Sequence, residues 1–280
     1  MQVSEFFRTL RSQGSTEGRL TRFRRVLSSA KNFPRYQPCL QRANLDSKRA
    51  INALRCVEDA LRHFDTIDLN DVRAAEPGFS SSRQFPPLPQ RFFNPLKRAS
   101  KVAVLTKGFD EIAGLRMFDE KACASLETFQ PEILAAPVSV LRRLVAALPK
   151  ESLARPRYAV VAFTGIEEVL DAQDRDLFWR NFEVPLFEQY IGLDGRVFAR
   201  ECEIHDGLHI VEEHAVIERH VDEELLLTSL TDIGRPTLRL KMGLSGIIEK
   251  TLCECGRVEP RLTAVSPIRR PSMAARTAVA

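Results

Sequence analysis

The spacing of apolar side chains divides the sequence into parts with different predicted structure. From residue 1 to 75, apolar positions recur every three or four residues, which predicts helices. One of these helices is predicted from Lys48 to Phe64, with Asp46 or Ser47 as its N-cap. Five prolines and three consecutive serines between residues 76 and 95 then indicate an irregular connector.

Between residues 100 and 190, short apolar runs alternate with amphipathic segments, which is typical of an α/β fold. The continuous apolar run from Tyr158 to Thr164 has the length of a buried strand. The predicted strands are 100–106, 132–135, 158–164 and 185–190, and the predicted helices are 120–126, 138–148 and 171–181.

From Val197 onward the pattern changes to short strands separated by turn residues, which indicates antiparallel pairing. The predicted strands are 199–204, 208–211, 215–218, 224–230, 237–241 and 246–252. The last eighteen residues have no apolar periodicity, so we expect them to be disordered.

Together these patterns predict an α/β protein with a helical N-terminal part, a mixed sheet and an antiparallel β region. A chain of 280 residues can form one large domain or two small ones. The expected regions are a helical part with its connector at 1–95, an α/β core at 96–196, an antiparallel β subdomain at 197–262 and a disordered tail at 263–280.

Composition excludes several classes of protein. A formal net charge of only +4 is too balanced to predict nucleic-acid binding, and the basic residues among the first fifty are explained by a solvated helical face. No apolar run reaches the roughly 18 residues of a membrane-spanning helix, and the N-terminus lacks the apolar core of a signal peptide. Six cysteines without a disulfide-framework spacing suit a reducing compartment, so we expect a cytoplasmic protein.

The main chemical signal lies between Tyr190 and Leu262, which contains four of the five histidines and three of the six cysteines. At its centre, Asp206-Gly207 lies between apolar-rich arms, a pattern that predicts a two-residue hairpin turn. With that turn, Cys202 pairs with Val211 and Ile204 pairs with His209. Alternation then places Cys202 and His209 on one face of the hairpin, within reach of one small ion.

Cys253 and Cys255 supply two further ligands, because an extended i, i+2 pair faces one side and Gly256 permits a sharp turn behind it. Three thiolates and one imidazole form a closed tetrahedral set without an open position, which is typical of structural zinc. We therefore predict a structural zinc site formed by Cys202, His209, Cys253 and Cys255. The alternative is that the cysteines are small buried hydrophobes.

Seven short segments between residues 100 and 262 also occur in a characteristic order. They are 129–141 (FQPEILAAPVSVL), 164–167 (TGIE), 190–194 (YIGLD), 200–203 (RECE), 206–214 (DGLHIVEEH), 227–231 (LTSLT) and 253–257 (CECGR). This series resembles the adenylate-forming enzymes of the phenylacetate-coenzyme A ligase family. The resemblance implies ATP-dependent activation of a carboxylate to an acyl-adenylate, transfer to a thiol, and in some members a zinc at the cysteine and histidine positions.

The departures from this family concern the parts that bind nucleotide. No Gly/Ser/Thr-rich phosphate loop occurs between Phe79 and Thr106, and the resemblance places Leu244 where the family has a ribose-binding aspartate. Only the tail follows Leu262, where the family has a C-terminal domain with a catalytic lysine. Phosphoryl charge would lack its main electrostatic stabilisers, so we expect complete adenylation chemistry to be absent.

Two functional hypotheses follow. The first is an adenylate-forming ligase, or a reduced relative that still binds an acyl, carboxylate or nucleotide ligand, with ATP and Mg²⁺ as possible cofactors. Its pocket would lie near Glu167, Tyr190, Asp194 and His214, although the two carboxylates could be solvated loop residues and His214 a hydrogen-bonded residue at a strand end. The second is a non-catalytic zinc-bearing scaffold that binds a partner protein, such as a true ligase, or a second copy.

Overall fold

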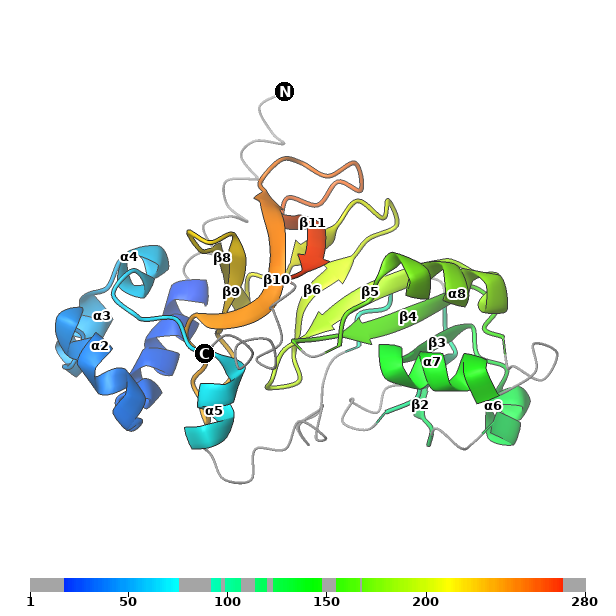
Figure 1. Cartoon of the computed structure of the whole chain (residues 1–280), viewed down its shortest axis with the longest axis horizontal. Helices are drawn as coiled ribbons and strands as arrows, with labels where there is room; N and C mark the ends of the chain where they lie inside the picture. The colour runs from blue at the N-terminus through cyan, green and yellow to red at the C-terminus, as the bar shows by residue number, and fades with distance from the viewer. Residues whose placement is uncertain are drawn as a thin grey trace, which may run out of the picture.

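One mixed β-sheet organises the protein. The computed structural model describes residues 18–75, 92–96, 99–106, 114–119, 123–147, 155–166 and 168–268. Among these residues, eleven strands form a single sheet in the order β2-β1-β3-β4-β5-β6-β7-β11-β10-β9-β8 (Figure 1). The strands are β1 (Val102–Val104), β2 (Leu115–Met117), β3 (Ile133–Pro137), β4 (Ala159–Thr164), β5 (Leu186–Ile191), β6 (Val197–Glu201), β7 (Leu208–Ile210), β8 (Ala215–Arg219), β9 (Glu224–Ser229), β10 (Leu240–Glu249) and β11 (Arg261–Pro267).

Strands β1 to β5 form the parallel half of the sheet. The residues of the central strands β3 and β4 are buried on both faces, as expected of parallel strands that are covered on both sides. One face packs against the helices α6 (Cys123–Phe129), α7 (Val138–Ala147) and α8 (Ala172–Phe182) (Figure 1). The other face packs against residues 92–96. Strand β5 then pairs antiparallel with β6, so the predicted α/β core and antiparallel region share one continuous sheet.

Helix α8 is positioned by its ends. Asp171 caps its N-terminus by accepting from the backbone N–H of Asp174, and the Asp174 side chain accepts from the backbone of Asp171, which completes a capping box. Asp174 also binds the guanidinium of Arg142 on α7 at 2.6 Å. These contacts fix the start of α8 against α7, and Arg175 near this start reaches Glu201 of the antiparallel strand β6.

The N-terminal helices form a separate apolar cluster against β8, β9 and the segment that leads into β10. They comprise a helical segment at 18–30, η1 (Pro34–Tyr36), α2 (Gln37–Arg42), α3 (Lys48–Ala53) and α4 (Val57–Leu61), followed by α5 (Leu69–Ala75). The helix predicted over 48–64 is thus two helices, because Leu54 and Cys56 adopt extended conformations between them. The predicted cap is correct, since the Ser47 side chain accepts from the N–H of Ala50.

The structure differs from the predicted strands in three places. The strands expected at 237–241 and 246–252 are one strand, β10, which stays continuous through an irregularity in its pairing with β9. Strand β2 was not predicted. Order does not end near residue 262, because β11 runs to Pro267 and pairs with both β10 and β7. Within the described ranges, no helix combines the length and apolar character needed to cross a membrane.

Candidate metal centre and adjoining cavity

The structure brings the four predicted metal ligands together. One ligand atom from each of Cys202, His209, Cys253 and Cys255 lies within 4.8 Å of the others. Cys202 follows the end of β6, His209 lies in β7, and the two other cysteines lie in the connection between β10 and β11. Three of the four side chains are buried and that of Cys255 is partly exposed. The cluster therefore joins three parts of the sheet that are separate in the sequence.

The predicted two-residue hairpin is wrong, although the residues that it placed near one another do cluster in the structure. Strand β6 pairs with β7 through Glu201 and Leu208, so the β6–β7 loop comprises all six residues from 202 to 207. The reason is a third strand: Arg261 of β11 binds both the carboxylate and the carbonyl oxygen of Asp206. A Cβ on Gly207 would lie 2.4 Å from the carbonyl oxygen of Leu262, so glycine permits this close approach.

Cys253 and Cys255 also differ from the prediction, because they lie in a turn and not in an extended segment. The N–H of Gly256 donates to the carbonyl of Cys253 at 2.9 Å, and Gly256 has a positive φ of +81° in the sharp turn predicted at this position. The turn presents both sulfurs to the same side, where Cys253 Sγ lies 3.8 Å from Cys202 Sγ and Cys255 Sγ lies 3.4 Å from His209 Nε2.

Two of the six distances between the ligand atoms match the edges of a tetrahedral zinc site, and all four atoms lie within 4.8 Å of one another. With Zn–S near 2.3 Å and Zn–N near 2.0 Å, a tetrahedron has S···S edges of about 3.8 Å and S···N edges of about 3.5 Å. The observed values of 3.8 Å and 3.4 Å correspond to such edges. The donor set of three sulfurs and one imidazole nitrogen leaves no position for a substrate, which fits a structural ion.

The electrostatics of the cluster reflect three thiols in a small volume. Burial raises the pKa of Cys202 to about 11. Burial also opposes ionisation of Cys253, but hydrogen bonds from the Cys255 backbone and from the neighbouring thiols outweigh it and hold the Cys253 pKa below its usual value. Burial, and then the charge of Arg257, lower the pKa of His209, so its imidazole is neutral and able to act as a ligand.

A cavity of about 790 Å³ adjoins the metal centre. One wall comes from the ends of β4 and β5, the start of α8 and the β6–β7 loop, and the opposite wall comes from β10 and β11. Because β6, β7 and β11 lie between β5 and β10 in the sheet, the sheet curves around this space. The β6–β7 loop therefore contributes to both sites, since Cys202 is its first residue, His209 lies just beyond its end, and its residues from His205 to Gly207 line the cavity.

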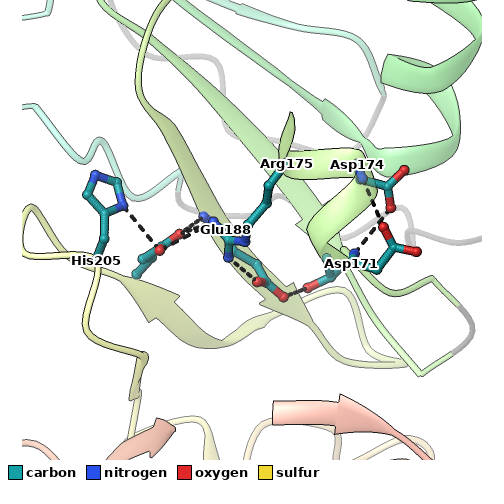
Figure 2. A network of polar contacts seen from close by, with 7 residues as sticks. Asp171, Asp174, Arg175, Glu188 and His205 are labelled. Atoms are coloured by element: carbon teal, nitrogen blue, oxygen red, sulfur yellow. Dashed lines mark hydrogen bonds and ion pairs between the residues drawn. The ribbon is translucent and has the colours of Figure 1, made fainter. Parts of the chain in front are cut away.

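A polar network forms one end of the cavity (Figure 2). Arg175 of α8 donates to Glu188 Oε2 at 2.9 Å and lies 3.4 Å from the carboxylate of Glu201. Thr164 donates its hydroxyl to Glu188 Oε1 at 2.8 Å, and His205 Nδ1 lies 3.1 Å from Glu201 Oε1. Burial, opposed by Arg175, raises the pKa of Glu188 to about 7.

The opposite end of the cavity is apolar. Met242, Leu244, Leu262 and Val265 line it and belong to the same apolar cluster as Tyr190. Leu244 is 4% exposed and Met242 is fully buried. Both side chains are apolar, so they offer a ligand apolar surface. The cavity thus has one apolar end and one polar end, with Tyr190 in contact with the apolar cluster and on the same face of β5 as Glu188.

Of the predicted pocket residues that the structure describes, Tyr190 lies at this cavity, and Asp194 and His214 do not. Asp194 lies in the β5–β6 turn and accepts from Ser229, Thr231 and the backbone N–H of Arg196. Its buried carboxylate therefore has a structural role in holding the turn.

The other two residues predicted to lie in the pocket are His214 and Glu167. Nδ1 of His214 lies 2.8 Å from the carbonyl oxygen of Val197, and its ring packs edge-on against Phe93. The Phe93 carbonyl accepts from Gln189, which faces away from Glu188 and Tyr190, so His214 lies on the other side of the sheet. Glu167 lies outside the described residues.

Sequence reasoning missed the polar network, which is made by Arg175, Glu188, Glu201 and Thr164. Gln189 pairs with Arg200, which places Glu188 opposite Glu201 on the neighbouring strand. The available signal was one glutamate in each of two otherwise apolar-rich strands, LFEQYI and VFARE. A buried carboxylate needs hydrogen-bond or charge partners, so such positions indicate a polar site inside the fold.

Comparisons with known proteins establish the fold. No protein-family model and no curated protein matches the sequence. Among solved structures, the chain is similar to 2-hydroxyisobutyryl-CoA ligase in complex with 2-HIB-AMP and CoA in the thioesterification state, with a TM-score of 0.62, 14% identity, and coverage of 91% of this chain and 69% of that chain.

Two further structures of 2-hydroxyisobutyryl-CoA ligase give the same result. An open conformation with 2-HIB-AMP and CoA has a TM-score of 0.62 at 14% identity, covering 87% of this chain and 67% of that one. The postadenylation state with 2-HIB-AMP has a TM-score of 0.60 at 13% identity, covering 87% and 65%. At these identities the similarity concerns the fold, and the chain has the fold of adenylate-forming CoA ligases.

Proposed function

We propose that this chain is a small-molecule-binding protein with the fold of adenylate-forming ligases, that it does not carry out adenylation, and that its cysteine and histidine cluster holds a structural zinc ion. The cavity beside the metal centre is the observation that carries the proposal. Its volume of about 790 Å³ lies within the range of roughly 300 to 1,000 Å³ that is typical of ligand sites. Apolar walls with a few converging polar groups are also typical of such sites.

The shape of the cavity favours a ligand with an apolar body and one polar end, such as a molecule that carries an acyl chain. Met242, Leu244 and Val265 offer apolar surface at one end, and Arg175 and Glu188 offer hydrogen-bonding groups at the other. Burial of each methylene group of such a chain contributes about 0.8 kcal/mol. A short alkyl chain is therefore sufficient for measurable binding.

A nucleotide fits this cavity less well. The resemblance to the phenylacetate-coenzyme A ligase family places a ribose-binding aspartate at position 244, where this chain has a leucine that is 4% exposed in an apolar cluster. A leucine accepts no hydrogen bond from ribose hydroxyls. The carboxylates of Glu188 and Glu201 would in addition repel phosphate groups at the polar end of the cavity.

The metal ion would hold the β6–β7 loop in place. Cys202 begins this loop and His209 lies just after it. Through the ion, both residues would be joined to Cys253 and Cys255 in the connection between β10 and β11. The ion supplies no open coordination position, so its contribution is to stability and to the shape of the cavity wall.

Binding of hexyl compounds tests the proposal. Calorimetric titration of the zinc-containing protein with hexanoate, 1-hexanol and hexylamine should detect binding of at least one of them. Val265→Phe, which fills the apolar end of the cavity, should abolish that binding, whereas Val221→Phe at a position that is 93% exposed should leave it unchanged. Absence of binding by all three compounds, or binding unaffected by Val265→Phe, would contradict the proposal and leave the partner-binding scaffold as the better hypothesis.

A further inference from the structure

The polar end of the cavity carries more negative than positive charge. Arg175 is the cation in contact with both Glu188 and Glu201, so two carboxylates share one guanidinium. The side chains of these two glutamates are 13% and 5% exposed, which limits screening by water. His205 adds a positive charge only when it is protonated.

The two carboxylates differ in how far their acceptor capacity is used. Glu201 accepts from the backbone N–H of Glu188 at 2.8 Å, from Arg175 and from His205. Glu188 accepts one hydrogen bond at each oxygen, from Thr164 and from Arg175. Each carboxylate oxygen can accept a second bond, so Glu188 retains capacity for a donor that enters the cavity.

Other acidic groups around the cavity are already paired. Asp206 is bound by Arg261, and Asp171 is occupied in the capping box of α8. Glu168 accepts from the backbone N–H of Ser139. Asp206 is thus neutralised by an arginine, whereas Asp171 and Glu168 are hydrogen-bonded to backbone N–H groups and retain their negative charge, so the wall around Glu188 and Glu201 is acidic as a whole.

Tyr190 is a second, independent indication of a ligand. It is 2% exposed, it belongs to the cavity wall, and its hydroxyl has no hydrogen-bond partner among the described residues. It follows Glu188 by two positions on β5 and therefore lies on the same face of the strand. A buried hydroxyl without a partner is costly, and a polar ligand group at this end of the cavity would reduce that cost.

We propose that the cavity selects a ligand whose polar end is an ammonium group, with Glu188 as its hydrogen-bond acceptor and an alkyl body extending toward Met242 and Val265. This inference rests on the proposed function, because it names the chemical class of the molecule that the same cavity binds. It differs from the carboxylate ligand that the family resemblance implied.

Charge balance explains the selection. An ammonium group beside Glu188 and Glu201 leaves two carboxylates facing two cations, and each new N–H···O bond is charge-assisted. A ligand carboxylate at the same place would bring a third negative charge to the single guanidinium of Arg175. Burial is the main cause of the raised pKa of Glu188, and the neighbouring charge of Glu201 adds to it.

The test compares three probes of the same chain length. At pH 8, hexylamine is positively charged, hexanoate is negatively charged and 1-hexanol is neutral. Titration of the zinc-containing protein should show hexylamine binding about tenfold more tightly than hexanoate. Glu188→Gln should weaken hexylamine binding about tenfold and change 1-hexanol binding by less than about twofold.

Glu218→Gln provides a matched control. Glu218→Gln removes another glutamate that is paired with an arginine, Arg239, but does not line the cavity, so it should not affect any of the three probes. Tighter binding of hexanoate than of hexylamine would overturn the ammonium inference while leaving the binding function intact. Failure of all three probes to bind would overturn both, and the comparison of probes on the unmodified protein remains decisive even if Glu188→Gln does not fold.

Discussion

The pH dependence of stability at Glu188 provides a quantitative test of the polar network. Its carboxyl group has a pKa of about 7 in the folded protein, against 4.5 without the fold, because burial disfavours the charged form. The groups that face it are Arg175, Thr164, Glu201 and Tyr190, with His205 acting through Glu201. A carboxyl group with a raised pKa lowers stability as the pH increases from the unfolded value through the folded value.

The magnitude follows from the difference between the two pKa values. At about pH 5.5 the ionisation of Glu188 lowers the free energy of unfolding by about 1.4 kcal/mol, and at about pH 8.5 by about 3.4 kcal/mol. Glu188→Gln removes this pH dependence. The variant also loses the hydrogen bond to Arg175, but the free-energy cost of that loss, counted from the protonated form of Glu188, is nearly the same at both pH values. The free energy of unfolding of the variant, relative to that of the unmodified protein, should therefore increase by about 2 kcal/mol from the lower to the higher pH.

Urea unfolding at the two pH values, with zinc present throughout, measures this difference. Glu127→Gln on the exposed side of α6 serves as the control and should show a pH-independent difference from the unmodified protein. A constant difference for Glu188→Gln, or a variant that loses stability as the pH increases, would refute the argument that Glu188 is a buried carboxylate with excess negative charge around it.

Further predictions concern the metal centre and β11. The purified protein should contain about one zinc per chain, and Cys253→Ser or Cys255→Ser should lower both metal content and melting temperature, whereas His205→Ala should leave metal content unchanged in an elemental analysis. Removal of the metal with a chelator should increase proteolytic cleavage in the β6–β7 loop and weaken ligand binding, because two ligands flank that loop. Leu262→Ala in β11 should lower the free energy of unfolding, measured with urea, by about 3 kcal/mol. Val258→Ala, at a position that is 49% exposed, should change it little. Equal effects of the two substitutions would contradict the placement of β11 in the core.

The sequence was sufficient to predict four of the five strands of the parallel half and the four cysteine and histidine residues that cluster in the structure. Apolar runs such as 158–164 are informative because strands covered on both faces have no polar positions. The clustering of these four residues could be predicted because cysteine and histidine are rare and only one region contained enough of them. The hairpin register was wrong because Arg261, more than fifty residues away, binds Asp206 and opens the turn.

The strand β11 and the cavity could not be predicted for a related reason. Arg261–Pro267 alternates buried and exposed residues only in part, and its pairing with β10 and β7 depends on the three-dimensional arrangement of the sheet. The pairing of Glu188 with Glu201 likewise depends on the register between β5 and β6. Short-range patterns contain no information about such partners, so the polar network emerges only from the assembled sheet.

The central claim is that this chain has the fold of adenylate-forming CoA ligases without their adenylation chemistry. The most direct test is the carboxylate-dependent exchange of pyrophosphate into ATP, measured on the zinc-containing protein with Mg²⁺ and a panel of aliphatic and aromatic acids, with an active acyl-CoA ligase as the positive control. We predict exchange at the background level for every acid, because Leu244 offers no ribose contact and the polar end of the cavity carries excess negative charge. Exchange above background that depends on any one of the acids would contradict the account.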